Sequence, residues 1–151
     1  MSTNLSRHFT LEEMLVSGAA ARRGIDMTPS PVVKVSLRAL CSTILDPLRE
    51  EIGQAVIVTS GYRPVKLNTL IGGSNTSQHC LGEAADIHVR GWTPMDLAKL
   101  IVSMGLPYDQ VILEFGQWVH VSHKAFGNQR KQQLTAKRNS SGVHYVPGLI
   151  A

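Results

Sequence analysis

The chain has 151 residues, of which 43% are hydrophobic and 17% are charged, with a formal net charge of +4. This length suits one compact domain and excludes two full-sized ones, and the composition is that of a globular protein rather than a disordered one. No apolar run approaches the roughly 18 residues of a membrane-spanning helix, and Met1–Phe9 lacks the apolar region of a secretory signal, so we expect a protein made in the cytoplasm without membrane insertion.

The first third of the sequence predicts helices. Thr10, followed three residues later by Glu13, has the pattern of a capping box that opens a short helix. Ser30 before Pro31 predicts a second helix start, because serine caps the first N–H groups and proline fits the first turn. Pro47 has no N–H, so it should kink or divide this second helix. The apolar residues at helical spacing are Val33, Leu37, Leu40, Cys41, Ile44, Leu45, Leu48 and Ile52.

The middle of the chain predicts strands joined by loops and one helix. Thr93-Pro94 starts that helix and Gly105 ends it, while Gly116-Gln117 is typical of a hairpin turn. The polar segment 60–78 predicts a long functional loop. Together these patterns predict a single α+β domain in which helices flank a mainly antiparallel sheet. The β-rich runs lie at 55–59, 84–89, 111–115 and 118–122.

Positive charge is concentrated at the C-terminal end. Residues 1–114 contain ten Lys/Arg and eleven Asp/Glu, whereas residues 115–151 contain five Lys/Arg and no carboxylate. We therefore divide the chain into a domain over 1–123 and a basic tail over 124–151. Such a tail either attracts an anionic surface or is a solubilising, partly disordered end. Its cations are Lys124, Arg130, Lys131, Lys137 and Arg138.

Two histidines and one aspartate in the second half have the residue types of a metal site. His79 and Asp86 are separated by Gly82, which permits a tight turn into a strand that could bring the carboxylate back beside the imidazole. Alternation along a later strand puts His120 on one face with Trp118. Taken singly, each residue has an ordinary alternative, such as a hydrogen-bonded surface pair. Two imidazoles and one carboxylate, with a fourth position left for water, match a catalytic zinc ion.

The full pattern Ser-x-His-x-x-Gly-x-Ala-x-Asp over 77–86, followed by Trp-Val-His at 118–120, resembles the zinc D-alanyl-D-alanine peptidases. This family includes bacterial D,D-carboxypeptidases and dipeptidases and many phage peptidoglycan endopeptidases. Ser60-Gly61-Tyr62-Arg63 and Asn68 also match, and the resemblance extends over about 5–122, with an N-terminal stretch similar to the small phage and prophage branch. It implies a fold shared with hedgehog signalling domains.

The resemblance also implies a single Zn²⁺ ion held by three residues of the pattern. Its ligands would be His79, Asp86 and His120. The fourth position would stay open for the chemistry, because three protein ligands leave zinc free to bind and acidify water.

One position departs from the family pattern. In the dipeptidase branch an acidic residue lies three positions before the last histidine ligand, and here that position is Gln117, which cannot take a proton from water. Hedgehog domains have an acidic residue six positions before that ligand, and Glu114 is similar to it. A hairpin turning at Gly116-Gln117 puts Glu114 nearly opposite Val119, so a twist or bulge would be needed to direct its carboxylate to the site. We predict Glu114 as the general base; the alternative is a solvated strand residue.

Further residues are candidates for contact with substrate. Arg63 lies in a Gly-Tyr-Arg-Pro turn, and its planar guanidinium suits a carboxylate or a tetrahedral oxyanion; the resemblance implies this substrate-side role. Ser77 either orients the ligand loop or touches substrate, and Tyr62 and Trp118 either line the cleft or pack in the core. His88 shares a strand face with the aspartate ligand and could line the site.

We expect a zinc metallopeptidase that hydrolyses D-Ala-containing peptide bonds of bacterial peptidoglycan, as a carboxypeptidase or an endopeptidase, with Glu114 and Arg63 as catalytic residues. Its partners would be peptidoglycan peptides and not nucleic acid, because the tail has few aromatic residues and no reading motif. It would be a monomer acting at the cell wall, through phage lysis or as a virion component. The alternatives are a non-catalytic zinc-binding module, which Gln117 keeps open, and a structural component of a virion tail.

Overall fold

The structure, a computed structural model, describes residues 3–74 and 76–151. Within these ranges, six strands form one sheet in the order β1-β2-β4-β3-β5-β6. The neighbouring strands are antiparallel except for β3 and β5, which are parallel. The predicted α+β class with a mainly antiparallel sheet is confirmed. The strands are β1 (Ile57–Ser60), β2 (Ala84–His88), β3 (Gln110–Glu114), β4 (Trp118–Ser122), β5 (Gln132–Asn139) and β6 (Gly142–Pro147).

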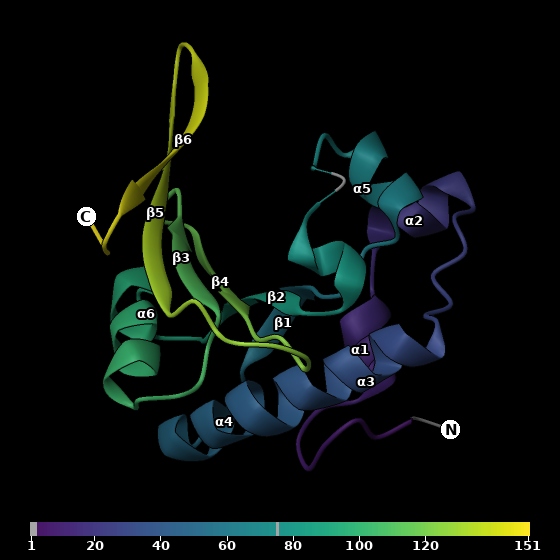
Figure 1. Ribbon diagram of the computed structural model, residues 1–151, viewed down its shortest axis with the longest axis horizontal. Coiled ribbons are helices and arrows are strands. Elements are labelled where there is room, and N and C mark those ends of the chain that lie inside the picture. Colours follow the sequence, from purple (N-terminus) through teal and green to yellow (C-terminus); the bar gives the residue numbers. More distant parts are fainter. Residues whose placement is uncertain (1–2, 75) are drawn as a thin grey trace.

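The helices gather on one side and at one end of the sheet (Figure 1). α6 lies against β3 and β4, and the long segment from α3 to α4 runs beneath the sheet. No helix in the described ranges is long and apolar enough to span a membrane. The helices are α1 (Leu11–Leu15), α2 (Gly18–Arg23), α3 (Pro31–Leu40), α4 (Asp46–Ile52), α5 (Val65–Leu70) and α6 (Pro94–Ser103), with a π-helical turn η1 (Cys41–Leu45) and a 3-10 turn η2 (Gln78–Leu81).

The predicted starts of α1 and α3 are confirmed. At α1 the Thr10 side chain accepts a hydrogen bond from the Glu13 N–H, and the Glu13 carboxylate accepts one from the Thr10 N–H. At α3 the Ser30 hydroxyl accepts from the Val33 N–H, with Pro31 in the first turn. These bonds satisfy N–H groups that have no partner inside the helix, and so they fix where each helix begins.

Pro47 divides the second predicted helix, and it does so through the π-helical turn η1. There the Asp46 N–H donates to the Cys41 carbonyl five residues earlier. Proline lacks an N–H and its ring crowds the carbonyl four residues before it, so a wider preceding turn relieves the contact. The buried stripe continues through the division, from Leu40 to Leu48.

The core lies between the helices and one face of the sheet. Its sheet side includes Ile87, Val119 and Val121, and its helix side includes Leu37 and Leu97. These side chains are almost completely buried, and each contributes about 1.5–3 kcal/mol by leaving water. Because strand residues alternate between faces, the opposite face of β2 and β4 is left to carry polar side chains.

Two strands occur where the sequence analysis expects a tail. The segment 124–151 contains β5 and β6, which continue the sheet beyond β3, and Figure 1 shows their hairpin projecting past the other strands. A hairpin at the edge of a sheet exposes most of its side chains, so its sequence lacks the alternation of apolar and polar residues that predicts a strand. The consecutive cations Lys137 and Arg138 are an example. The segment is therefore part of the domain's sheet. In addition, α5 lies inside the predicted loop 60–78.

A buried carboxylate attaches the C-terminal segment to the rest of the domain. Asp109 is fully buried, and the Arg130 guanidinium donates to it with Nη2 2.6 Å from Oδ2. The Gln78 amide donates to the same carboxylate at 3.0 Å. Burial alone would raise the pKa of Asp109, but the hydrogen bonds and charge of Arg130 outweigh it and hold the pKa below its usual range. Asp109 therefore stays ionised in mildly acidic solution.

Asp109→Asn should lower the free energy of unfolding at pH 7 by about 1–3 kcal/mol, because it removes a buried, hydrogen-bonded charge. A carboxyl group with a lowered folded-state pKa stabilises the protein above its unfolded-state pKa of about 3.9, and this contribution is lost as the pH falls through the folded-state pKa. In urea unfolding, the gap between wild type and variant should therefore shrink in acid. Glu51→Gln, at an exposed position, is the control and should change little. A gap that grows in acid would contradict this role.

Candidate metal centre

Two neighbouring strands bring Asp86 and His120 face to face. β2 and β4 are antiparallel, with Asp86 directly opposite His120. The Asp86 Oδ1 lies 3.3 Å from the His120 Nδ1, and both residues are buried. They lie on the face of the sheet that does not pack on the helical core. The register of this one strand pair therefore sets the relative position of two candidate ligands.

His79 reaches the same point from η2. Its Nε2 lies 3.3 Å from the Asp86 Oδ1, and its ring centroid is 5.0 Å from that of His120. The side chain is 2% exposed. Three residues from a turn and two strands thus direct donor atoms into one small volume.

The turn that carries His79 is shaped by its two flanking residues. The Ser77 hydroxyl accepts a hydrogen bond from the His79 N–H and caps the turn. Gly82 ends it with a φ of 74°, and a Cβ there would lie 2.8 Å from the Val33 carbonyl oxygen. Glycine is therefore required both for the left-handed backbone and for the close approach to α3.

The second nitrogen of His79 orients the ring. Nδ1 lies 2.8 Å from the carbonyl oxygen of Gly61, directly after β1, so Nδ1 donates and Nε2 is left with a free lone pair. Gly61 in turn packs on α1: a Cβ added to Gly61 would lie 2.6 Å from the Met14 carbonyl oxygen. The Tyr62 N–H donates to that same carbonyl at 2.8 Å. The Ser-Gly-Tyr-Arg segment therefore positions His79 through its backbone.

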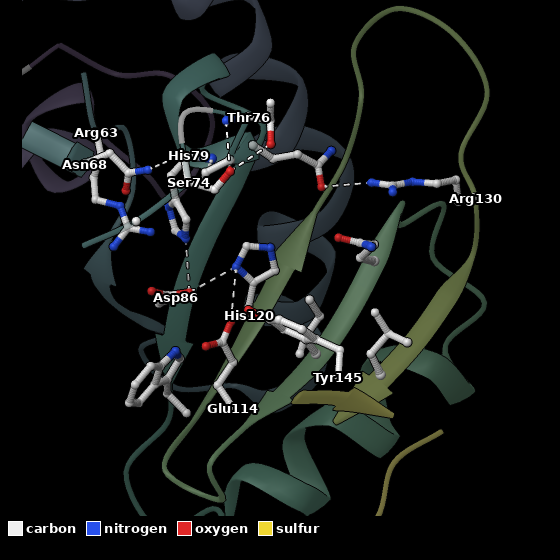
Figure 2. A pocket seen from close by; sticks show the side chains of 17 residues that line it. Arg63, Asn68, Ser74, Thr76, His79, Asp86, Glu114, His120, Arg130 and Tyr145 are labelled. Atoms are coloured by element: carbon white, nitrogen blue, oxygen red, sulfur yellow. Dashed lines mark hydrogen bonds and ion pairs between the residues drawn. The ribbon is translucent and has the colours of Figure 1, made fainter. Parts of the chain in front are cut away.

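The three side chains form a cluster that could hold a metal ion (Figure 2). One donor atom from each of His79, Asp86 and His120 lies within 4.8 Å of the others. Over the described ranges, no further His, Cys, Asp or Glu joins this cluster. Two imidazoles and one carboxylate fit a zinc ion that keeps one open position.

The surroundings keep Asp86 in its anionic form. Burial alone would raise the pKa of Asp86, but the neighbouring imidazoles of His120 and His79 outweigh burial and hold the pKa well below its usual range. A divalent cation binds a carboxyl group in its ionised form, so Asp86 is in the protonation state that metal binding requires.

Glu114 lies on the same face as the cluster. β3 and β4 pair so that Glu114 is opposite Trp118, and its Oε1 is 3.8 Å from the His120 Nδ1. The expected pairing of Glu114 with Val119 is wrong by one residue, because the hairpin loop has three residues and starts with Phe115 at a positive φ of 56°. No bulge is therefore needed to direct the carboxyl group toward the cluster.

The electrostatic environment of Glu114 differs from that of Asp86. Burial raises the pKa of Glu114 more than the charges of His120 and Arg63 lower it, and the negative Asp86 adds to the rise. A carboxyl group with a raised pKa is better matched to exchanging protons near neutral pH.

The cluster opens into a cleft of about 510 Å³, within the range of about 300–1,000 Å³ for small-ligand sites. Arg63, Ser77 and Trp118, predicted as substrate contacts, all line it. In the described part of the chain, Tyr62 is not among the lining residues and packs against the core instead, and His88 also lies outside the lining.

Several lining residues were missed by the sequence analysis. Arg130, Leu134 and Tyr145 belong to the segment 124–151, for which the sequence predicts a tail and indicates no connection to the cleft. Asn68 matches the family pattern, but this match alone does not identify it as a residue that lines the site. The missed lining residues include Asn68, Gln110, Ile112, Arg130, Leu134 and Tyr145.

Arg63 and Trp118 both line the cleft, and each has a buried side-chain N–H group. The Arg63 backbone N–H donates to the His79 carbonyl at 3.0 Å, which fixes the turn beside the cluster. Among the described residues, the buried Arg63 Nε and Trp118 Nε1 atoms have no hydrogen-bond partner. Buried N–H groups are normally paired, so these two atoms are unused donors beside the cleft.

The model of one protein family, described as Peptidase M15, matches residues 7–122. The chain belongs to the peptidase M15 family. This is the family of zinc D-Ala-D-Ala peptidases, so the resemblance stated from the sequence is confirmed. Membership in this zinc-dependent family supports a hydrolase, and the His-Asp-His cluster is a possible site for its metal. A comparison with curated proteins finds no match.

Gly61→Ala should weaken zinc binding about 10- to 100-fold, because the added Cβ would displace the carbonyl that orients His79. Competition with a chromogenic chelator measures the affinity. Gly105→Ala is the matched control: it strains a left-handed glycine at the end of α6 and should lower stability without changing zinc affinity. Equal zinc affinity in the Gly61 variant and wild type would contradict the orienting role.

Proposed function

We propose that this peptidase M15 protein is a zinc metallopeptidase that hydrolyses D-Ala-containing peptide bonds of bacterial peptidoglycan. The observation that carries the proposal is the convergence of His79, Asp86 and His120 beside Glu114 in one cleft. Family membership supports the peptidase chemistry. The resemblance to D-alanyl-D-alanine peptidases supports the substrate class.

The three clustered residues would hold the ion. When bound there, zinc would supply Lewis-acid catalysis and would lower the pKa of water. Asp86 contributes the negative charge, and His79 is kept in its metal-binding orientation by the Gly61 carbonyl. Because these donors come from paired strands and a capped turn, they need little rearrangement to bind.

Glu114 is the proposed general base. It takes a proton from the attacking water as the new C–O bond forms, and gives a proton to the leaving amine as the C–N bond breaks. Its position next to His120 and its raised pKa support this role. Gln117 is exposed in the hairpin turn, so the acidic function missing at that position is assigned to Glu114 on the adjacent strand.

Arg63 is the proposed anion-binding residue. Its Nε is buried without a partner among the described residues, and the side chain lines the cleft. A guanidinium there would stabilise the oxyanion of the tetrahedral intermediate or hold a substrate carboxylate. Trp118 and Ser77 line the same cleft and complete the proposed substrate contacts.

The proposed place of action is the bacterial cell wall, reached through phage lysis or as part of a virion. The exposed cations Lys137 and Arg138 of β5 would favour approach to anionic wall polymers. The enzyme is proposed to act as a monomer.

Glu114→Gln should retain zinc and lower kcat by about 10²- to 10⁴-fold, because the amide cannot accept the proton from water. Mass spectrometry of muropeptides released from purified sacculi measures the rate and identifies the bond cleaved. His120→Ala should lose both zinc and activity. Near-normal turnover in Glu114→Gln would overturn the assignment of the base.

The same assay separates the enzyme from its alternatives. A zinc-loaded wild type that releases no muropeptide, with or without chelator, would favour a non-catalytic zinc module. Release that stops when the chelator is added and returns with zinc would exclude it.

Arg63→Ala should lower kcat/KM by about 10²- to 10³-fold, the usual cost of losing one donor to the oxyanion. Lys66→Ala removes an exposed cation from α5 nearby and should leave the rate unchanged. Steady-state kinetics on a soluble muropeptide compares the two. Equal losses in both variants would show that only the general positive charge matters.

A further inference from the structure

The last two strands give the cleft a second wall. β5 pairs with β3 and β6 pairs with β5, whereas the range matched by the family model ends at residue 122. Leu134 of β5 and Tyr145 of β6 line the same cleft as the metal cluster. This wall therefore belongs to the chain's own C-terminal segment.

One row of residues extends from the cluster as an apolar floor. His120 is opposite Ile112, and Ile112 is opposite Leu134. Opposite residues of neighbouring strands share a face, so both aliphatic side chains lie on the side of the sheet that carries His120. A substrate group lying over this row would meet carbon atoms rather than hydrogen-bonding groups.

The neighbouring row ends at Tyr145. Glu114 is opposite Ala136, and Ala136 is opposite Tyr145. Ala136 is small and completely buried, which leaves space above it for the tyrosine ring. Figure 2 shows Tyr145 entering from β6 on the side of the cleft where Glu114 and His120 lie.

The Tyr145 hydroxyl is a donor at neutral pH. Burial raises the pKa of Tyr145, and the negative charges of Glu114 and Asp86 raise it further. The residue is nevertheless 56% exposed, so a ligand in the cleft can reach it.

The opposite wall has a different character. It is formed by Arg63 and by the hydroxyl-bearing residues Ser74, Thr76 and Ser77. Figure 2 shows Arg63, Ser74 and Thr76 on the side of the cluster away from Tyr145. The cleft thus has a polar, cationic side and an apolar, aromatic side, with the metal cluster between them.

We propose that Tyr145 and the floor formed by Ile112 and Leu134 make up a subsite for an alanine residue of the peptide. This alanine lies on the other side of the scissile bond from the part of the substrate that contacts Arg63. The alanine methyl group packs on the two aliphatic side chains, and the Tyr145 hydroxyl donates a hydrogen bond to a backbone carbonyl of the peptide. This inference rests on the proposed function and names the part of the substrate that the C-terminal hairpin recognises.

The test compares Tyr145→Phe and Tyr145→Ala with wild type on one soluble muropeptide. KM should rise about fivefold in Tyr145→Phe, the effect of one neutral hydrogen bond, and about tenfold or more in Tyr145→Ala, which also loses the ring contact. The kcat should stay within about threefold, since binding shared by ground and transition states changes KM alone. Binding is measured separately by calorimetric titration of the same muropeptide into zinc-loaded Glu114→Gln, with and without Tyr145→Ala. The added Tyr145→Ala substitution should lower the affinity by the same factor by which it raises KM.

His144→Ala is the matched control. His144 neighbours Tyr145 on β6 but contacts Asn139 and Ser141 at the hairpin turn, away from the cleft. It should leave KM and peptide affinity unchanged. Tyr145 variants that bind and cleave like wild type would overturn the subsite while leaving the proposed function intact. A zinc-loaded wild type that neither binds nor cleaves muropeptides would overturn both.

A change in the substrate tests the apolar floor separately. Replacing the recognised alanine by glycine should lower kcat/KM of the wild type about fourfold, the effect of burying one methyl group. In Leu134→Ala the ratio of kcat/KM for the alanine peptide to kcat/KM for the glycine peptide should fall toward one. An unchanged ratio in Leu134→Ala would contradict the contact, whatever the effect of the substitution on stability.

Discussion

The antiparallel register of β2 and β4 is the constraint on which the site depends. Asp86 and His120 can meet only because they are direct partners in this pair, and a shift of one residue would turn one of them toward the helices. The register is fixed on the other face, where Ile87 pairs with Val119 and both are completely buried. The same burial that stabilises the fold therefore positions two of the three candidate ligands.

The remaining parts of the site are held by contacts between distant segments. His79 depends on the Gly61 carbonyl, and Gly61 depends on a close contact with Met14 of the first helix. The C-terminal wall is attached through Asp109 and Arg130. Both ends of the chain thus contribute to a cleft whose motif residues lie in the middle of the sequence.

Much of this arrangement could be predicted from the sequence, because its signals are local. The Thr10 cap, the division at Pro47 and the motif around His79 need only neighbouring residues to be recognised. The position of Glu114 could not be derived, since it depends on Phe115 adopting a left-handed conformation that phenylalanine rarely takes. Tyr145 was missed because a parallel pairing with β3, invisible in the sequence, carries its hairpin to the cleft.

X-ray absorption at the zinc edge of the zinc-loaded protein would show directly which atoms surround the ion. One zinc ion per chain should be surrounded by nitrogen and oxygen donors alone, at about 2.0–2.1 Å, with the scattering pattern of two imidazole rings. A sulfur donor at about 2.3 Å, for which the buried Cys80 beside His79 would be the source, or a third imidazole, would contradict the proposed ligand set.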